Sequence, residues 1–204
     1  MACEHQLNFE ANGILSMIYK RSIPLLLLAT CILAAPGIAL AQTSQLSGTG
    51  SVQYDLVHKF HKFTGISKAM VVRGSVDASG LKVMARAQVG TFDSENSNRD
   101  QHMMETVEGE KYPWVSVRAA LPGFKLPTSG TTKVNVQASV ELHGVSVSHP
   151  IDITLETKDG THFRASFQFP ESLTAHKIER PSLMFVAVDD TITISGKAEI
   201  TAKP

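Results

Sequence analysis

Apolar and polar residues alternate with a period of two along most of the chain. In one run, for example, Val134, Val136 and Ala138 are separated by Asn135 and Gln137. Because successive side chains of a strand point to opposite faces, each run predicts a strand with one apolar and one polar face, as in antiparallel sheet wetted on one side. The runs cover residues 81–89, 134–142, 151–155, 163–169 and 192–200.

Three further strands are predicted at 52–60, 68–76 and 114–121, and turn-forming residues stand at 77–80, 122–123, 129–130 and 158–160. The polar stretch 42–47 predicts a flexible lead-in. Gly144 interrupts a strand pattern at His143-Gly144-Val145, which predicts a bend within a long strand.

One segment, 96–107, lacks the alternation and predicts a short helix. Asn96 or Ser97 can cap its start, and Gly109 can end it. Its Met103, Met104 and Val107 are expected to face the sheet, and a second helical turn is expected at 170–174. About eight antiparallel strands and one helix leave two architectures open, a two-sheet sandwich or a closed barrel.

The N-terminal 41 residues have the order of a secretory signal peptide. Lys20 and Arg21 precede an apolar run, and the segment ends at Ala39-Leu40-Ala41. We therefore predict cleavage after Ala41, with Met17 as an alternative true start and no membrane span after cleavage. Residues 42–204 then form one domain, located in the periplasm or secreted.

Composition narrows the function of this domain. Cys3 and Cys31 both lie in the leader, so packing must stabilise the domain without disulfides. The whole chain has 19 basic and 19 acidic residues, and the leader contains two of each, so the domain is neutral. This excludes a basic field for nucleic acid and a polybasic membrane patch.

Catalytic and metal-binding patterns are weak. His58 and His61 have H-x-x-H spacing, but on one strand they would face opposite sides, so we predict no metal site. The sequence has no G-x-S-x-G motif, and Gly48-Thr49-Gly50 is not followed by a helix pattern, so neither a hydrolase nor a phosphate loop is indicated. We predict a binding protein, not an enzyme, without a cofactor.

Four segments then resemble the YceI-like, lipocalin-like polyisoprenoid-binding proteins. The first, 54–65, resembles an opening strand that ends in Phe63-Thr64-Gly65. The second, 89–103, contains Asn96 and the pair Arg99-Asp100, and Tyr112-Pro113 follows it. The third, 140–145, resembles a His-Gly hairpin corner, and the fourth consists of 178–184 with 188–190. The resemblance covers nearly all of 50–200. Lys59 and the Arg180-Pro181 stretch depart from the family pattern and indicate a divergent branch.

The resemblance implies an all-β, antiparallel eight-stranded barrel with one short helix and a long apolar cavity. It further implies an isoprenoid-like lipid, such as a polyprenyl phosphate or a quinone, as the ligand. Arg99 could pair with a phosphate headgroup. Predicted ligand-binding residues are Leu56, Phe60, Val83, Ala85, Trp114, Val136, Phe167 and Ile194, with Met103 and Met104 as a helical flap.

Two alternatives stay open from the residues alone. The domain could be a structural or interaction module with a filled core, or a histidine-based metal or redox protein. The predicted inner positions mix bulky residues with Ala85, Ala87, Ala138, Ala165 and Ala198, which favours space inside the sheet. A homodimer is also left open.

Overall fold

The computed structural model describes residues 43–204 except 60, 184 and 185. The predicted signal peptide, the alternative start at Met17 and the predicted ligand-binding residue Phe60 lie outside the described residues.

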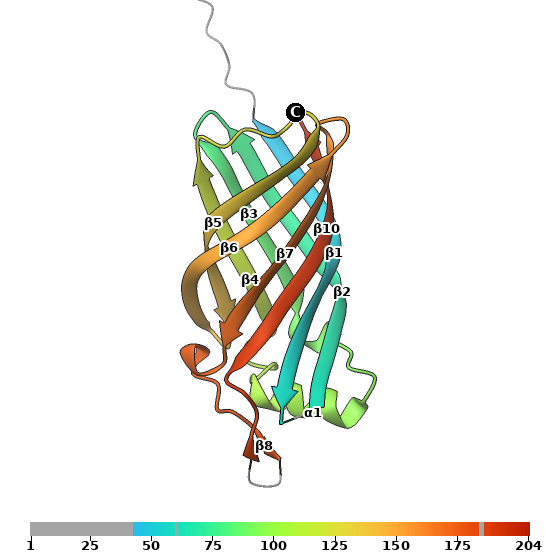
Figure 1. Cartoon of the computed structure of the whole chain (residues 1–204), viewed down its shortest axis with the longest axis vertical. Helices are drawn as coiled ribbons and strands as arrows, with labels where there is room; N and C mark the ends of the chain where they lie inside the picture. Colours follow the sequence, from blue (N-terminus) through green and yellow to red (C-terminus); the bar gives the residue numbers. More distant parts are fainter. Residues whose placement is uncertain (1–42, 60, 184–185) are drawn as a thin grey trace, which may run out of the picture. The chain divides into compact units, whose positions relative to one another are not determined.

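Eight long antiparallel strands close into a barrel (Figure 1). Their order around the barrel is β1-β10-β7-β6-β5-β4-β3-β2, and β10 closes it by pairing with β1. The predicted eight-stranded barrel is therefore confirmed, and a two-sheet sandwich is excluded. The strands are β1 (Ser44–His58), β2 (His61–Asp77), β3 (Gly80–Gln88), β4 (Trp114–Pro122), β5 (Gly130–Leu142), β6 (Val145–Thr157), β7 (His162–Ser172) and β10 (Thr191–Lys203).

The ends of β1 differ from the sequence prediction. The strand begins at Ser44, because Gln45 to Ser47 pair with both β2 and β10, so the prediction of a flexible lead-in at 42–47 is wrong for these residues. The strand also ends at His58, where Lys59 takes a positive φ of 54° and the chain turns back into β2.

A two-residue turn, His143-Gly144, joins β5 to β6. Both residues have positive φ, 53° and 68°, and Leu142 pairs directly with Val145. Positive φ at both central residues belongs to the turn type whose twist matches paired strands. The prediction of a bend within one long strand is thus wrong, and the hairpin corner implied by the family resemblance is confirmed.

The predicted helix is α1 (Ser97–Thr106), which lies with the short β8–β9 hairpin, β8 (Ser182–Leu183) and β9 (Val186–Ala187), at one end of the barrel (Figure 1). Asn96 caps the helix, its side-chain oxygen accepting from the Arg99 amide at 3.0 Å. Two 3₁₀ turns complete the chain, η1 (Val89–Thr91) and η2 (Thr174–His176). The second helical turn predicted at 170–174 starts later than expected, because β7 continues to Ser172.

The pairing between β6 and β7 stops halfway along the strands. It joins Ile153–Thr157 of β6 to Phe163–Phe167 of β7. Through the described stretch 145–172, no pairing joins 145–151 of β6 to 168–172 of β7, and Figure 1 shows β6 bending away from the straighter β7 there. We call these two unpaired segments the seam.

Candidate functional site

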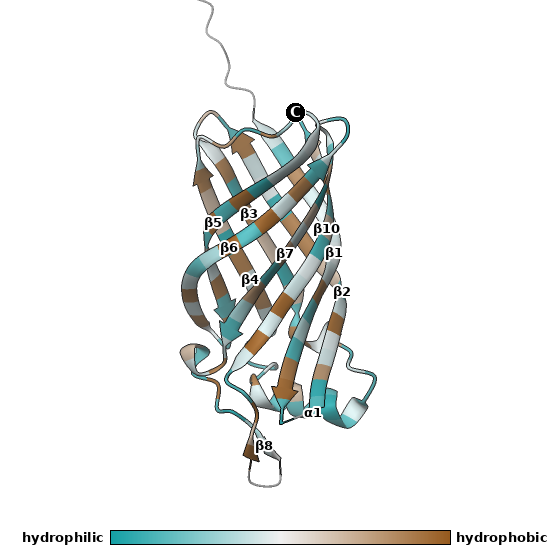
Figure 2. Ribbon diagram, viewed as in Figure 1, coloured by the Kyte–Doolittle hydropathy of each residue, from teal (hydrophilic) through white to brown (hydrophobic). Residues whose placement is uncertain are grey.

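The barrel encloses an apolar space. Figure 2 shows apolar and polar bands alternating along the strands, and the apolar positions form the inner face. The half of the barrel next to α1 contains a cavity of about 240 Å³, and the other half contains one of about 130 Å³. Five residues line both cavities, which therefore adjoin: Met70, Ala85, Val117, Phe167 and Phe169. We call the combined space the lumen.

Small inner side chains create this space. Each of the alanines expected to face inward lines one or both cavities: Ala85, Ala87, Ala138, Ala165 and Ala198. A glycine makes room for an aromatic ring in the same way, because a Cβ on Gly196 would lie 2.4 Å from the Phe167 ring. Together the two cavities reach the lower end of the usual size for small-molecule sites, about 300 Å³.

The lumen opens at the α1 end. His102 lines the larger cavity, yet its side chain is 80% exposed, so this part of the lining lies at the surface. Arg99 lies beside it on the same helix. At the other end, Phe124 and Leu126 of the β4–β5 connection line the smaller cavity and cover it.

Arg99 is held in a fixed position at this opening. Its Nε donates to Ser94 Oγ at 2.9 Å, and its guanidinium carbon lies 5.2 Å from the centre of the Phe63 ring. Burial, together with the Asp100 carboxylate, raises the pKa of Tyr54, and Arg99 offsets part of this shift. Tyr54, which also lines the larger cavity, therefore keeps its proton. The opening thus presents two donor side chains, Arg99 and Tyr54.

Most predicted ligand-binding residues line the lumen. They are Leu56, Val83, Ala85, Met103, Val136, Phe167 and Ile194, and Arg99 lines it as well. Their contact with a ligand stays a prediction.

Trp114 and Met104 lie elsewhere. Trp114 is 40% exposed, and its ring packs against the Arg86 guanidinium at 4.5 Å. Val115 and Val117, which alternate with it, face the lumen, so the prediction that Trp114 faces inward is wrong. Met104 packs against Gly109 and does not line the cavities.

Two further residues, neither of them among the predicted ligand-binding residues, line the lumen. Phe169 lines both cavities, and its ring centre lies 6.0 Å from that of Phe167. Glu171 lines the larger cavity and is 4% exposed. Both continue the alternation that begins at Phe163, and extending that run by one step would have placed Glu171 inward.

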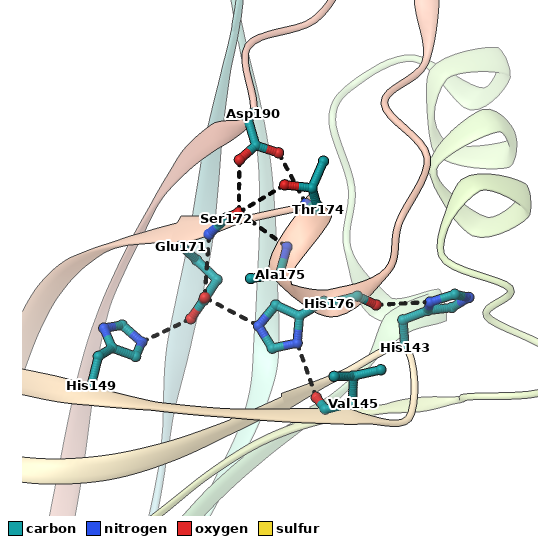
Figure 3. Close-up of polar contacts among 9 residues, drawn as sticks. All are labelled: His143, Val145, His149, Glu171, Ser172, Thr174, Ala175, His176 and Asp190. Atoms are coloured by element: carbon teal, nitrogen blue, oxygen red, sulfur yellow. Dashed lines mark hydrogen bonds and ion pairs between the residues drawn. The ribbon is translucent and has the colours of Figure 1, made fainter.

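Two histidines enclose the Glu171 carboxylate (Figure 3). The nitrogen Nε2 of His149 lies 2.9 Å from Oε2, and Nε2 of the fully buried His176 lies 3.1 Å from Oε1. The second contact is an ion pair, not a well-aligned hydrogen bond. We call these three residues the His–Glu–His network.

The network shifts the titration of two of its members. Burial by itself raises the pKa of Glu171, but His176 and His149 outweigh it and the pKa is lowered from its ordinary value of 4.5. Burial likewise opposes protonation of His176, but Glu171 and the Val145 carbonyl outweigh it and raise its pKa above 6.5.

The H-x-x-H pair is arranged differently from the prediction. His58 and His61 pair across the β1–β2 turn and lie on two strands, not on one. His58 is buried against the Val186 carbonyl oxygen at 3.2 Å, whereas His61 is exposed. Within residues 43–204, apart from the three undescribed positions, no three side chains are grouped to hold a metal ion.

A closed antiparallel barrel with an apolar lumen open at one end defines the class of lipocalin-like barrels. Within this class, the sequence matches the model of the YceI-like domain over residues 41–200, and the chain therefore belongs to the YceI-like family.

Solved structures show the same fold at low sequence identity. A polyisoprenoid binding domain from Saccharophagus degradans is 14% identical, with a TM-score of 0.66 over 78% of this chain and 98% of that one. BcnA from Burkholderia cenocepacia is 15% identical, with a TM-score of 0.61 over 74% and 95%. The YceI protein of Campylobacter jejuni is 16% identical, with a TM-score of 0.55 over 72% and 89%. No curated protein matches the chain.

Among the described residues, no helix has the length and apolar character needed to cross a membrane.

Proposed function

We propose that this chain is an exported binding protein that carries or sequesters an isoprenoid-like lipid, with the tail of the lipid in the lumen. The observation that carries the proposal is the pair of adjoining apolar cavities inside a closed barrel. Moving apolar surface out of water into such a space gains about 25 cal/mol per Å². A tail of several isoprene units can therefore bind without polar contacts.

The comparisons support a lipid ligand. The structure from Saccharophagus degradans is described as a polyisoprenoid binding domain, and it shares this barrel. A polyprenyl phosphate and a quinone both combine a long apolar tail with a headgroup rich in acceptor oxygens. The order of charge, apolar run and small residues before residue 42 supports export to the periplasm or beyond.

The opening at α1 supports an orientation for the lipid. Arg99 and Tyr54 both line the larger cavity, and both donate hydrogen bonds. A phosphate or quinone oxygen suits such donors, and the guanidinium suits phosphate best. The proposed headgroup position is therefore the α1 end, with the tail running toward Phe124.

The first test is direct. The exported protein is purified natively from its export compartment, and an organic extract of it is examined by mass spectrometry. Recovery of a prenyl lipid or quinone in proportion to the protein is the expected result. Protein that contains no such lipid and does not bind any long-chain prenyl lipid offered to it would contradict the proposal.

The headgroup assignment is tested with Arg99→Gln. A hydrogen bond to a charged group is worth about 1.5–3 kcal/mol, so the Kd for farnesyl phosphate should rise roughly tenfold or more. The Kd for farnesol, which has no phosphate, should stay constant. Arg164→Gln, a control on the exposed Arg164–Glu199 ion pair, should change neither. An equal loss for both lipids would show that Arg99 acts through Ser94 and the local fold instead.

A further inference from the structure

The His–Glu–His network lies across the seam. In the paired part of β6 and β7, Ile153 stands opposite Phe167. Continuing that register along both strands sets His149 opposite Glu171. Backbone pairing is absent there, and the 2.9 Å contact between these two side chains takes its place. The network therefore joins two strands whose backbones have separated.

The protonation state of His176 follows from its partners. Its Nδ1 lies 2.9 Å from the Val145 carbonyl oxygen, which only accepts, so Nδ1 must carry a proton. Its Nε2 faces Glu171 Oε1, and an ionised carboxylate also only accepts. With both nitrogens protonated, His176 forms a buried ion pair with the Glu171 carboxylate, and this pairing raises the pKa of His176 above 6.5. The network contains a buried ion pair, which is costly to break on one side only.

The Glu171 carboxylate has little capacity left for a ligand. Oε1 lies 3.1 Å from His176 and accepts from the Ser172 amide at 3.2 Å, and Oε2 is engaged by His149. Although Glu171 lines the lumen, its oxygens are already bound by the protein itself. This favours a structural role across the seam over a headgroup site.

Other charged groups surround the network without entering it. His143, in the β5–β6 turn, has Nδ1 3.1 Å from the His176 carbonyl oxygen and Nε2 3.5 Å from Glu108. On the β10 side, Asp190 accepts from Ser172 Oγ at 2.7 Å and from the Thr174 amide at 2.9 Å. These contacts anchor η2, which carries His176, against the end of β7 (Figure 3).

We propose that the seam is a lateral port into the lumen, closed by the His–Glu–His network, through which the apolar tail of a lipid enters and leaves. This inference rests on the proposed lipid-binding function. The residues Phe169 and Leu173, on either side of Glu171, line the larger cavity, so separation of the seam exposes this cavity from the side. A long tail can then move in sideways and need not be threaded from one end.

Such a port depends on pH in a defined direction. The pKa of Glu171 is lowered from 4.5 by its histidine partners, which outweigh its burial, and the pKa of His176 is raised above 6.5 by Glu171. Between pH 4.5 and pH 6.5, Glu171 is therefore ionised and His176 protonated, and the ion pair is complete. Protonation of Glu171 in more acidic solution removes the charge that holds His176, and the port opens more often.

The test compares Glu171→Gln with Glu199→Gln in the full-length protein. Both replace a carboxylate by an amide of the same shape, but Glu199 is 70% exposed and bridges the paired strands β7 and β10 from outside. Hydrogen exchange at pH 6, where the ion pair is complete in wild-type protein, should rise about tenfold in 145–151 and 168–173 for Glu171→Gln only. Unchanged exchange in these segments would overturn the network as the closing element.

The second measurement follows N-phenyl-1-naphthylamine, an apolar probe whose fluorescence rises in a dry cavity. A port changes access and not affinity, so association and dissociation rates should rise together in Glu171→Gln while the Kd stays constant. Faster exchange with unchanged probe rates would overturn the port. If wild-type protein does not bind the probe, the proposed function fails, and hydrogen exchange still decides the role of the network.

A second variant guards against loss of the fold. His149→Gln keeps a donor for Glu171 Oε2 and leaves the buried ion pair with His176 intact, so it should fold and show a smaller rise in exchange and in both rates. For wild-type protein, the probe should also dissociate faster as the pH is lowered from 6 to well below 4.5, where Glu171 takes up a proton. A pH-independent rate would contradict the port.

Discussion

The substitution Ala85→Phe tests whether the interior of the barrel is an empty lumen or a filled core. Ala85 lies on β3 and lines both cavities, so its side chain sits where they adjoin. A phenylalanine there adjoins cavity space on both sides. The same residue would also occupy the path of a lipid tail from the α1 end toward the smaller cavity.

The expected magnitudes have opposite signs in the two cases. Full burial of a phenylalanine side chain in available apolar space stabilises a protein by about 1.5–3 kcal/mol. Insertion of the same ring into a closely packed core costs about 1–3 kcal/mol. With the cavities present, we expect Ala85→Phe to hold or raise the free energy of unfolding. Each kcal/mol corresponds to about 2–4 °C in Tm for a domain of this size.

The assay is urea unfolding without ligand, together with titration of geranylgeraniol. Ala85→Phe should keep or gain stability and lose lipid affinity, because the tail and the ring compete for one space. Lys82→Phe is the matched control, since Lys82 is exposed on the outward face of β3, and it should leave affinity unchanged. A loss of about 2 kcal/mol in Ala85→Phe with unchanged affinity would refute the lumen.

Two further predictions concern stability. Gly144→Ala should destabilise the protein more than Gly123→Ala. Both glycines have positive φ, but only at Gly144 would the new Cβ meet a side chain, that of Tyr112, at 2.4 Å. The urea unfolding midpoints of the two variants test this, and equal losses would contradict the clash with Tyr112. In wild-type protein, the lowered pKa of Glu171 gives stability that is lost as the pH falls below 4.5, and the raised pKa of His176 gives stability that is lost as the pH rises above 6.5. In Glu171→Gln, the urea unfolding midpoint should depend less on pH, both below 4.5 and above 6.5. A pH profile of the midpoint identical to that of wild type would contradict the ion pair.

The strands and the inner face could be predicted because side chains of a strand alternate between the buried and the solvent-exposed face, so apolar and polar residues alternate in the sequence. Val83, Val136 and Phe167 each lie within a long alternating run, and each faces the lumen. Trp114 is the first residue of its strand, so the alternation can be followed only on its C-terminal side. There Val115 and Val117 form the inward-facing set, and this register places Trp114 on the outer face.

Closure of the barrel and the seam could not be predicted from local patterns. Pairing of β1 with β10 joins residues separated by most of the domain, and nothing in either strand specifies that partner. The end of pairing between β6 and β7 leaves no mark in their alternation, which continues through His149 and Glu171. The spacing of histidines in the sequence suggests metal ligands, whereas the two histidines next to Glu171 act as charge and hydrogen-bond partners.

The lumen and the seam have a common physical origin. A barrel wall is stabilised by backbone pairing and by side chains packed across its interior. Here small residues such as Ala138 and Ala165 leave the interior partly empty, so opposite walls support each other less than in a filled barrel. The wall must then be held where its backbone pairing ends. A buried carboxylate between two histidines provides that hold with groups that titrate, so the interaction that closes the seam is one that protons can release.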